Sequence, residues 1–435
     1  MDPVCLALYA LYFWGCSVYA VLAPFYPDYA YAKNLNEKQV GYIFSLYAIV
    51  ALFLSPVNGR IMNSIGRKNV LLIGGILESI GMLLFSWVVT LEDSAFFTFS
   101  LLARILMGAG GSGVLVTCFA VISNLYPDEM ESKIGVMETL GGVGLMAGPF
   151  IGGILFSIGG YHFVMITYTL VFLVLTGFTY KILPQDNPEP VKNEEKVKYK
   201  QIFSIPKILF ALVAVVFGMA GPAFLEPVLA KFLKEDLNYG KLVTGILFGL
   251  PTLGYTVAML LLTRIPKNID RRHILFVGLF IEGVSFIVVG PWSVIAEPNL
   301  VSVIIGLTFL GFGSAWAYIP SLPFLTDIAS HEWPSSNKEA LGNTLSTIMG
   351  TTHYFGEAIG PIIGGVCCYM FETPNGFAFF GGLILVYFFV FGIINKQFTA
   401  FLERDLYVKQ EDSSDINNPG KGEKYEVIEF SESIK

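Results

Sequence analysis

The sequence predicts an all-α membrane protein of two six-helix bundles, twelve transmembrane helices in all, that are related by internal duplication. Of the 435 residues, 54% are hydrophobic and only 14% are charged, and the mean hydropathy is +0.64. Soluble proteins carry about 25% charged residues, so this composition indicates a polytopic membrane protein. The lengths of the apolar stretches and a repeated sequence pattern give the number of helices and their grouping.

Twelve apolar stretches have the length of about 20 residues that a helix needs to cross a bilayer. In the first half of the chain we expect spans at residues 4–26, 40–57, 69–89, 96–120, 134–158 and 163–182. In the second half we expect them at residues 208–229, 242–262, 274–292, 300–322, 341–370 and 377–394. The chain enters its first apolar run at once and without a basic flank, so we predict a retained helix rather than a cleaved signal peptide.

Two polar segments set the domain boundaries. Residues 184–205 form a linker rich in Glu and Lys, and residues 401–435 form a polar tail that we expect to be disordered. The N-terminal bundle is therefore expected at residues 1–183 and the C-terminal bundle at residues 206–400.

Three pairs of similar segments have nearly the same separation along the chain. The pairs are Arg67–Glu78 with Arg271–Glu282, Gly148-Pro149 and Gly152-Gly153 with Gly360-Pro361 and Gly364-Gly365, and Leu22-Ala23-Pro24 with Leu225-Glu226-Pro227. Such a repeat indicates two copies of one helical unit. A duplicated helical bundle in lipid is typical of secondary transporters, which bind their substrate between the two halves.

The distribution of basic residues predicts the orientation. Lys and Arg concentrate after the even-numbered spans and in the linker, as at Arg67-Lys68 and Arg271-Arg272, whereas the opposite loops hold few. Because cytoplasmic loops are enriched in Lys and Arg, we expect both termini and the linker to be cytoplasmic. The net charge of -7 gives no indication of nucleic-acid binding.

Several motifs resemble those of major facilitator transporters. The loop from Asn58 to Lys68 resembles their motif between helices 2 and 3, residues 148–153 resemble the helix-5 motif of the proton-antiporter branch, and Arg104 with the glycines that follow resembles the helix-4 motif of that branch. The resemblance implies the major facilitator fold, and it implies conformational roles for Gly59, Gly66, Arg67, Gly148, Pro149, Gly152, Gly360, Pro361 and Gly364.

A sharper resemblance is to the vesicular amine transporter family. Phe224-Leu225-Glu226-Pro227 and Ala23-Pro24-Phe25-Tyr26-Pro27 carry it, and residues 137–149, with Glu138, look most like the vesicular polyamine transporter branch. Two positions depart from the family pattern. Asn63 stands where the helix 2–3 motif normally has an acid, and Gly350 aligns with an aspartate of the monoamine branch, with Glu357 following it.

Carboxylates inside the spans are the main candidates for substrate binding and proton coupling, because a charge at the bilayer centre costs about 2.5–3.5 kcal/mol. Glu226, beside Pro227, is the first candidate, with a structural hydrogen bond as the alternative. Glu138 either binds a second ammonium group or is stabilised by its helix N-terminus. Glu357 precedes the Pro361 bend on a helix that is expected to line the cavity.

Four further charged residues have structural alternatives. Glu78 and Glu282 are equivalent by duplication, and each either contacts substrate or bonds a neighbouring helix. Asp327 either gates or caps the cytoplasmic end of its helix. Arg104 is expected to need a carboxylate or carbonyl partner and to serve proton coupling or structural support.

The sequence predicts a transporter rather than an enzyme. No G-x-x-x-x-G-K-[ST] motif is present, and the five cysteines lack metal-ligand spacing, so we expect no metal or cofactor and a proton gradient as the energy source. We predict proton-coupled antiport of small organic cations by a functional monomer, with polyamines as the first candidates and monoamines behind them. A vesicle or endomembrane is favoured over the plasma membrane. The alternatives are a plasma-membrane multidrug/proton antiporter and a non-transporting, receptor-like membrane protein.

Overall fold

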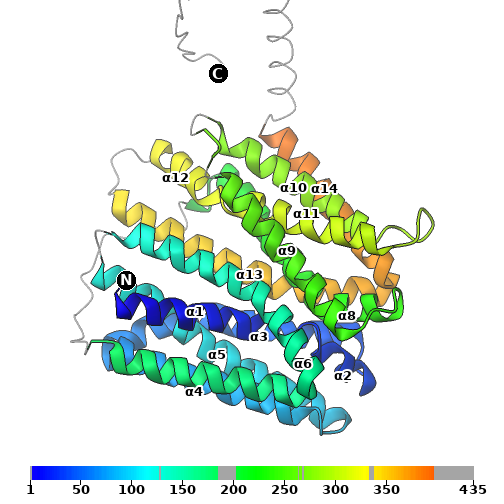
Figure 1. The fold of residues 1–435 in the computed structure, drawn as a ribbon. Coiled ribbons are helices and arrows are strands. Elements are labelled where there is room, and N and C mark those ends of the chain that lie inside the picture. The colour runs from blue at the N-terminus through cyan, green and yellow to red at the C-terminus, as the bar shows by residue number, and fades with distance from the viewer. Residues whose placement is uncertain are drawn as a thin grey trace, which may run out of the picture.

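The computed structural model describes residues 2–126, 129–184, 202–262, 264–266, 269–332 and 338–395, and these residues form helices joined by short connections, without strands (Figure 1). The predicted polar tail, and the predicted linker apart from its first residue and its last four, lie outside the described residues. The all-α fold class is confirmed.

In the part of the first half that the structure describes, the chain forms six helices. They are α1 (Pro3–Ala20), α2 (Tyr26–Ala32), α3 (Glu37–Ile65), α4 (Arg67–Val88), α5 (Asp93–Leu125) and α6 (Met130–Ile182). The second half forms α8 (Pro206–Glu235), α9 (Lys241–Leu262), α10 (Arg271–Val289), α11 (Leu300–Tyr318), α12 (Ser321–Glu332), α13 (Lys338–Phe371) and α14 (Thr373–Ile394). Within the described residues, 11 helical stretches are long and apolar enough to cross a membrane.

The long helix α6 contains two spans. Gly160 interrupts it with φ 72 and ψ -168, a backbone conformation that glycine adopts readily. The Tyr168 hydroxyl donates a hydrogen bond of 3.0 Å to the carbonyl of Gly148, so the parts before and after Gly160 fold back on each other. This hairpin accounts for the predicted spans at 134–158 and 163–182 and brings the number of membrane passes to twelve.

Two of the predicted spans are interrupted. The stretch expected at 4–26 ends as α1 at Ala20 and resumes as α2 at Tyr26, and Pro24 lies in the turn between them. The stretch expected at 300–322 divides into α11 and α12 around Pro320. Proline has no N–H to continue a helical hydrogen-bond ladder, which explains both breaks.

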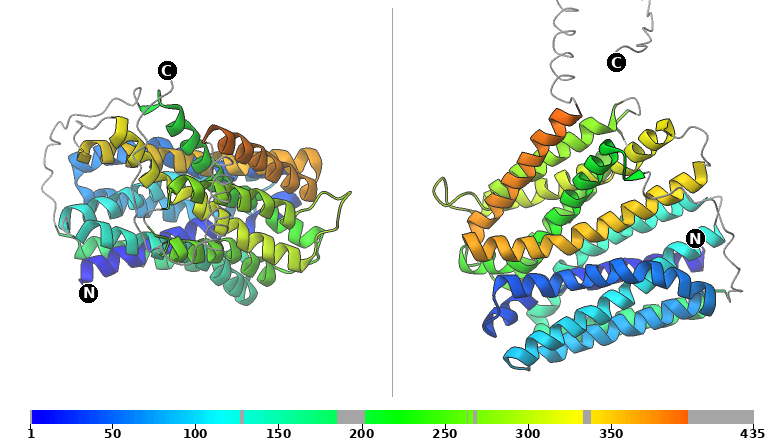
Figure 2. Two further views of the ribbon diagram at one scale, coloured as in Figure 1. Left: turned by 90° about the horizontal axis from the view of Figure 1, so that it is seen from above. Right: turned by 180° about the vertical axis from the view of Figure 1, so that it is seen from behind.

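The two halves contact each other mainly through α3 with α13 and α6 with α9. Gly41 of α3 lies against the carbonyl of Pro361 in α13, and Gly245 of α9 lies against the carbonyl of Pro149 in α6. The equivalent glycines thus face equivalent Gly-Pro helices, as expected for a duplicated unit. The halves meet at the end that carries α2 and the α8–α9 connection, and their helices diverge toward the other end (Figures 1 and 2).

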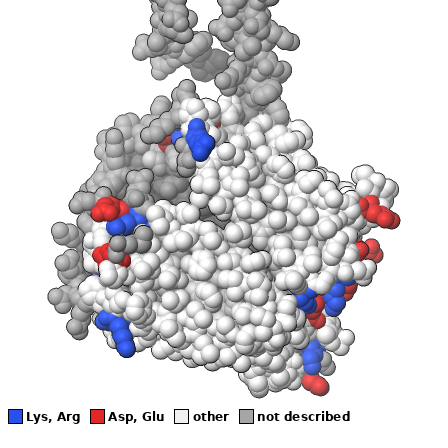
Figure 3. All heavy atoms as spheres, viewed as in Figure 1, with Lys and Arg blue, Asp and Glu red and all other residues white. Residues whose placement is uncertain are grey.

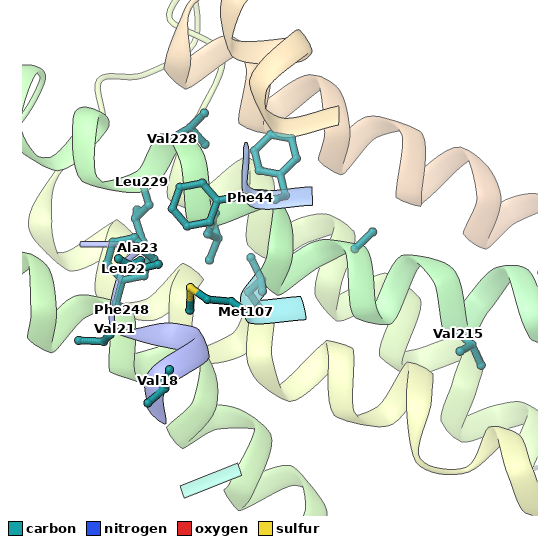
Figure 4. Close-up of a cluster of buried hydrophobic side chains, with 14 of the residues drawn as sticks. Val18, Val21, Leu22, Ala23, Phe44, Met107, Val215, Val228, Leu229 and Phe248 are labelled. Carbon is teal, nitrogen blue, oxygen red and sulfur yellow. The ribbon is translucent and has the colours of Figure 1, made fainter. Parts of the chain in front are cut away.

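The surface has the polarity of a membrane protein. On the face that Figure 3 shows, acidic and basic side chains gather toward the ends of the helices, and the broad region between them carries none. Large apolar side chains such as Phe53, Leu170 and Val174 are exposed. The buried hydrophobic cluster includes residues of both halves, among them Leu22, Phe44, Val228 and Leu229 (Figure 4).

Candidate functional site

Glu226 lies within α8 between Pro222 and Pro227, and the helix continues through both prolines. Pro227 cannot donate a backbone hydrogen bond, so the preceding turn of the helix has a free carbonyl. The side chain is partly exposed, and its Oε2 has no hydrogen-bond partner among the described residues. The unpartnered oxygen of a carboxylate in a membrane helix can take a proton or bind a cation.

Residues from both halves surround the Glu226 carboxyl group. The Tyr19 hydroxyl of α1 forms a hydrogen bond with it. The charges of Arg104 of α5 and Glu357 of α13 also act on it. The N-terminal half therefore supplies a hydroxyl group and a cation, and the C-terminal half supplies two carboxyl groups. The sequence predicted Glu226, Glu357 and Arg104, and the structure brings these three together.

Arg104 is 1% exposed and has an unusual environment. The centre of its guanidinium group lies 4.5 Å from the centroid of the Phe44 ring and 5.6 Å from that of Phe85. Its Nε and Nη1 atoms have no hydrogen-bond partner among the described residues. Aromatic faces, which attract cations, thus lie against the guanidinium group, and Glu226 supplies the opposite charge.

Glu357 is one turn before Pro361 in α13 and is paired within its own helix. Nε2 of His353 lies 3.3 Å from Oε1 of Glu357, and the two side chains are 30% and 20% exposed. The Tyr318 ring of α11 lies edge-on to the His353 ring, with centroids 5.3 Å apart. The pair gives the site a second carboxyl group with an imidazole ring beside it.

Glu78 and Glu282 are not among the groups that act directly on the Glu226 carboxyl group, and each is buried inside its own half. Glu282 is 0% exposed, accepts a hydrogen bond of 3.0 Å from the Ser314 hydroxyl and packs against Gly313. Glu78 is 1% exposed and packs against Gly110 of α5. Each of the two acids thus packs between helices of its own bundle.

The remaining predicted residues occupy varied positions. Asp327 is exposed on α12, and Glu138 lies in α6 with its side chain outside the described part of the structure. Gly59 has no neighbour where a side chain would project. Gly66 joins α3 directly to α4 at Arg67 and has φ 84, which favours glycine. The side chain of Asn63 also lies outside the described part.

The Gly-Pro motifs form close helix contacts. Gly148 and Gly152 bring α6 against α1, and Gly360 and Gly364 bring α13 against α8. At Gly360 and Gly364 a side chain would strike the backbone carbonyls of Ala220 and Phe224. Small residues four positions apart allow helices to approach closely in membranes, as the sequence predicted.

Ion pairs join the two halves at the end where they meet, which we call the closed end (Asp28, Glu37, Lys231, Lys234 and Lys241). Nζ of Lys231 lies 2.5 Å from Oε1 of Glu37, and Asp28 pairs with Lys241 and, at 3.5 Å, with Lys234. All ion pairs that the structure describes between the halves are at this end. Tyr31 adds a hydrogen bond of 2.8 Å to the carbonyl of Pro227.

Sequence reasoning missed the closed end and Tyr19. A partial signal for the closed end was present: the loop after the first span holds Asp28 and Glu37 beside two lysines, and the corresponding loop of the second half holds three lysines beside two acids. Opposite charges in equivalent loops favour contact between the halves. No such signal marked Tyr19 among the aromatic residues of the first span.

The sequence and the fold are similar to those of known proteins. The sequence matches the family model of the Major Facilitator Superfamily over residues 6–231 and 221–404. It is 25% identical to the MFS-type transporter SLC18B1 of Mus musculus over 359 residues, which cover 81% of this chain and 78% of the relative. It is 24% identical to the synaptic vesicular amine transporter of Homo sapiens over 76% of this chain and 62% of that protein. The crystal structure of the nucleoside transporter NupG superposes with a TM-score of 0.69 at 14% identity, covering 91% of this chain and 100% of that one.

Proposed function

Because the chain belongs to the major facilitator superfamily of membrane transporters, we propose that it exchanges protons for small organic cations by alternating access, with polyamines or related amines as cargo. The single observation that carries this proposal is the position of Glu226. Its carboxyl group has an unpartnered oxygen and lies between the halves, beside Tyr19 and near the opposite charge of Arg104. Substrate sites of such duplicated transporters lie between the two halves.

The proposed exchange follows from competition for one carboxyl group. A deprotonated Glu226 attracts an ammonium group, and a protonated Glu226 does not, so cargo and proton bind in turn. Arg104 offsets the negative charge when neither ligand is bound, which lowers the cost of an ionised carboxylate at this depth. The charge of Arg104 is fixed because the guanidinium group stays protonated.

The choice of cargo rests on the number of carboxyl groups. Glu357 lies near Glu226, and Glu138 belongs to a helix of the other half. Several separated acids suit a molecule with several ammonium groups better than a molecule with one. The similarity to a vesicular amine transporter supports an amine cargo, and we propose a vesicle or endomembrane as the location.

Alternating access requires the closed end to separate. With the orientation that the basic loops predict, the closed end faces the lumen, and the structure corresponds to a cytoplasm-facing state. In the proposed cycle an amine binds to deprotonated Glu226 from the cytoplasm, the lysine pairs with Asp28 and Glu37 break, and protons from the lumen release the cargo. The Gly-Pro helices α6 and α13 accommodate the movement through their close glycine contacts.

Uptake into liposomes tests the proposal. Purified protein in liposomes with an acidic interior is expected to accumulate labelled spermidine, and an uncoupler is expected to abolish the accumulation. Glu226→Gln keeps the shape of the side chain but cannot exchange a proton, so it should reduce uptake at least tenfold. Glu297→Gln, in an exposed loop, is the control and should transport normally.

Three results would change the assignment. Full activity of Glu226→Gln would contradict the mechanism. Equal uptake of spermidine, dopamine and unrelated cations would favour a multidrug antiporter. No uptake of any cation by folded, inserted protein would favour the receptor-like alternative.

A further inference from the structure

Glu78 has the most unusual environment of the carboxyl groups outside the central site. It is 1% exposed on α4, and both of its carboxyl oxygens are buried without a hydrogen-bond partner among the described residues. A buried carboxyl group without partners destabilises a helix bundle. Its position therefore calls for a role besides packing.

Tyr47 of α3 is the polar neighbour of Glu78. The Tyr47 hydroxyl fills the position that a Cβ atom on Gly111 would occupy, and Oε1 of Glu78 lies 3.3 Å from that same Cβ position. Gly110 allows the backbone of α4 to approach α5 closely at Glu78. The two consecutive glycines of α5 thus leave one small space that a carboxyl group and a phenol hydroxyl both border, without a hydrogen bond between them in this conformation.

Tyr47 also faces the central site. Its ring packs against the ring of Tyr19, with centroids 4.8 Å apart and an interplanar angle of 61°. The Tyr19 hydroxyl in turn interacts with Glu226. Both tyrosines are partly exposed. Glu78, Tyr47, Tyr19 and Glu226 therefore form a continuous row of neighbours across α4, α3, α1 and α8.

The equivalent acid of the second half has different surroundings. Glu282 receives a hydrogen bond from Ser314, which satisfies one of its oxygens. When the sequences of the two halves are aligned through Gly41 and Gly245, the residue equivalent to Tyr47 is Pro251. The second half therefore has no phenol hydroxyl group for Glu282 at that position. The row of tyrosines is a feature of the first half alone, and Glu282 is a built-in control.

Among the described residues, the other helices around Glu78 place no further charged group against its carboxyl group. On α5, Arg104 is directed onto the rings of Phe44 and Phe85. On α6, Thr176 packs against Gly75, and the ring of His162 bonds to Ser86 two turns along α4 from Glu78. Tyr47 is thus the titratable group that the described residues place beside the Glu78 carboxyl group.

We propose that Glu78 is a second proton-carrying group, which exchanges its proton with Glu226 through the hydroxyl groups of Tyr47 and Tyr19. Protonated Glu226 gives its proton to the Tyr19 oxygen, Tyr19 passes its own proton to the Tyr47 oxygen, and Tyr47 passes its proton to the Glu78 carboxylate. Each phenol gains one proton and loses one, and the net change is one proton moved. A hydroxyl group serves as both donor and acceptor, so neither phenol needs to become charged.

The relay separates the stored proton from the cargo. With the first proton on Glu78, the ionised Glu226 takes a second proton from the lumen. When the site faces the cytoplasm, Glu226 releases its proton, receives the stored proton back from Glu78 through the same hydroxyl groups and releases that one too. Only then does an ammonium group bind to Glu226. The exchange then involves one proton more than Glu226 alone would carry. This inference rests on the proposed proton-coupled function.

The test compares Glu78→Gln and Tyr47→Phe with the control Glu282→Gln. Reconstituted protein is given labelled spermidine at a clamped membrane potential, and its equilibrium accumulation is measured against the imposed pH gradient. In both test variants we expect the slope of log accumulation against pH gradient to fall by one, which is about a tenfold loss for each pH unit. The control should keep the slope of the unmodified protein.

Tyr47→Phe keeps the ring and removes only the hydroxyl group, so the slope can still be measured in this variant if Glu78→Gln fails to fold. An unchanged slope in the folded test variants would overturn the proposal. An equal fall in Glu282→Gln would also overturn it, because the effect would then come from packing.

Infrared spectroscopy separates this proposal from the proposed function. In pH-difference spectra of the protein without cargo, we expect Glu78→Gln to lose one protonated-carboxyl band and Tyr47→Phe to shift that band. These changes would support proton exchange at Glu78 even if spermidine proved not to be the cargo. Spectra of both variants identical to that of the unmodified protein would overturn the inference and leave the proposed function standing.

Discussion

Lys231 and Glu37 join the two halves of the molecule, with Nζ of Lys231 2.5 Å from Oε1 of Glu37. Lys231 belongs to the last turns of α8, and Glu37 begins α3. Their side chains are 24% and 14% exposed, so the pair is screened less than a surface pair. It lies next to the hydrogen bond between Tyr31 and Pro227, one residue from Glu226 along the chain.

Reversing one charge of this pair should open the closed end. Glu37→Lys places two cations together and is expected to disfavour the closed end by about 1 kcal/mol, roughly a fivefold change in population. The double variant Glu37→Lys/Lys231→Glu should restore the original distance distribution between spin labels on the two halves. Failure of the double variant to restore it would show that the pair does not hold the halves together.

Glycine at position 41 is expected to be necessary for the closed end. A side chain there would strike the carbonyl of Pro361, so Gly41→Ala should destabilise this conformation by about 1–3 kcal/mol through overpacking. The same spin-label distances report the change. Gly177→Ala, where nothing lies within 4 Å, is the control, and equal effects of the two substitutions would contradict the argument.

We expect that lysine cannot replace Arg104 functionally. Its planar guanidinium group lies over Phe44 and near Phe85, and the compact ammonium group of lysine cannot stack in the same way. We expect Arg104→Lys to reduce spermidine uptake at least tenfold, whereas Arg264→Lys, outside the spans, should have no effect. Normal uptake by Arg104→Lys would show that only the positive charge matters.

Asp270 is expected to stabilise the start of α10. Its side chain accepts hydrogen bonds from the backbone N–H and the Nε of Arg272. Although partial burial opposes ionisation, these bonds lower the pKa of Asp270 below its usual range. The stabilisation is therefore present above the ordinary pKa of an aspartate and is lost as pH falls through the lowered value.

Asp270→Ala should lower the free energy of unfolding by about 1 kcal/mol at neutral pH, the usual value of an N-cap. Thermal unfolding in detergent measures the difference, and Asp270→Asn, which keeps the cap oxygen, should lose less. If the difference in unfolding free energy between Asp270→Ala and the unmodified protein grew as the pH fell, the predicted direction of the pH dependence would be wrong.

The architecture was predictable from the sequence because apolar runs mark the membrane spans and the internal repeat marks the two bundles. Apolar runs of spanning length gave the twelve passes, and Gly148-Pro149 with Gly360-Pro361 gave the internal repeat. The breaks at Pro24 and Pro320 were not predicted, since hydropathy continues through both positions.

The central site was predictable only in part. Glu226, Glu357 and Arg104 stood out because charges are rare in spans. Tyr19 and Tyr47 did not, because aromatic side chains are common in membrane helices and only the tertiary structure brings these two rings together. The aromatic partners of Arg104 come from α3 and α4, and their approach depends on tertiary contacts that the sequence does not display.

The most direct measurement of the central claim is proton release when cargo binds. Spermidine added to weakly buffered purified protein should displace protons, detected by a pH indicator, and the release should rise with spermidine to saturation. Release that is lost in Glu226→Gln and kept in Glu297→Gln would confirm that cargo and proton compete for this carboxyl group. Saturable spermidine binding with no proton release, or equal release from Glu226→Gln, would contradict it.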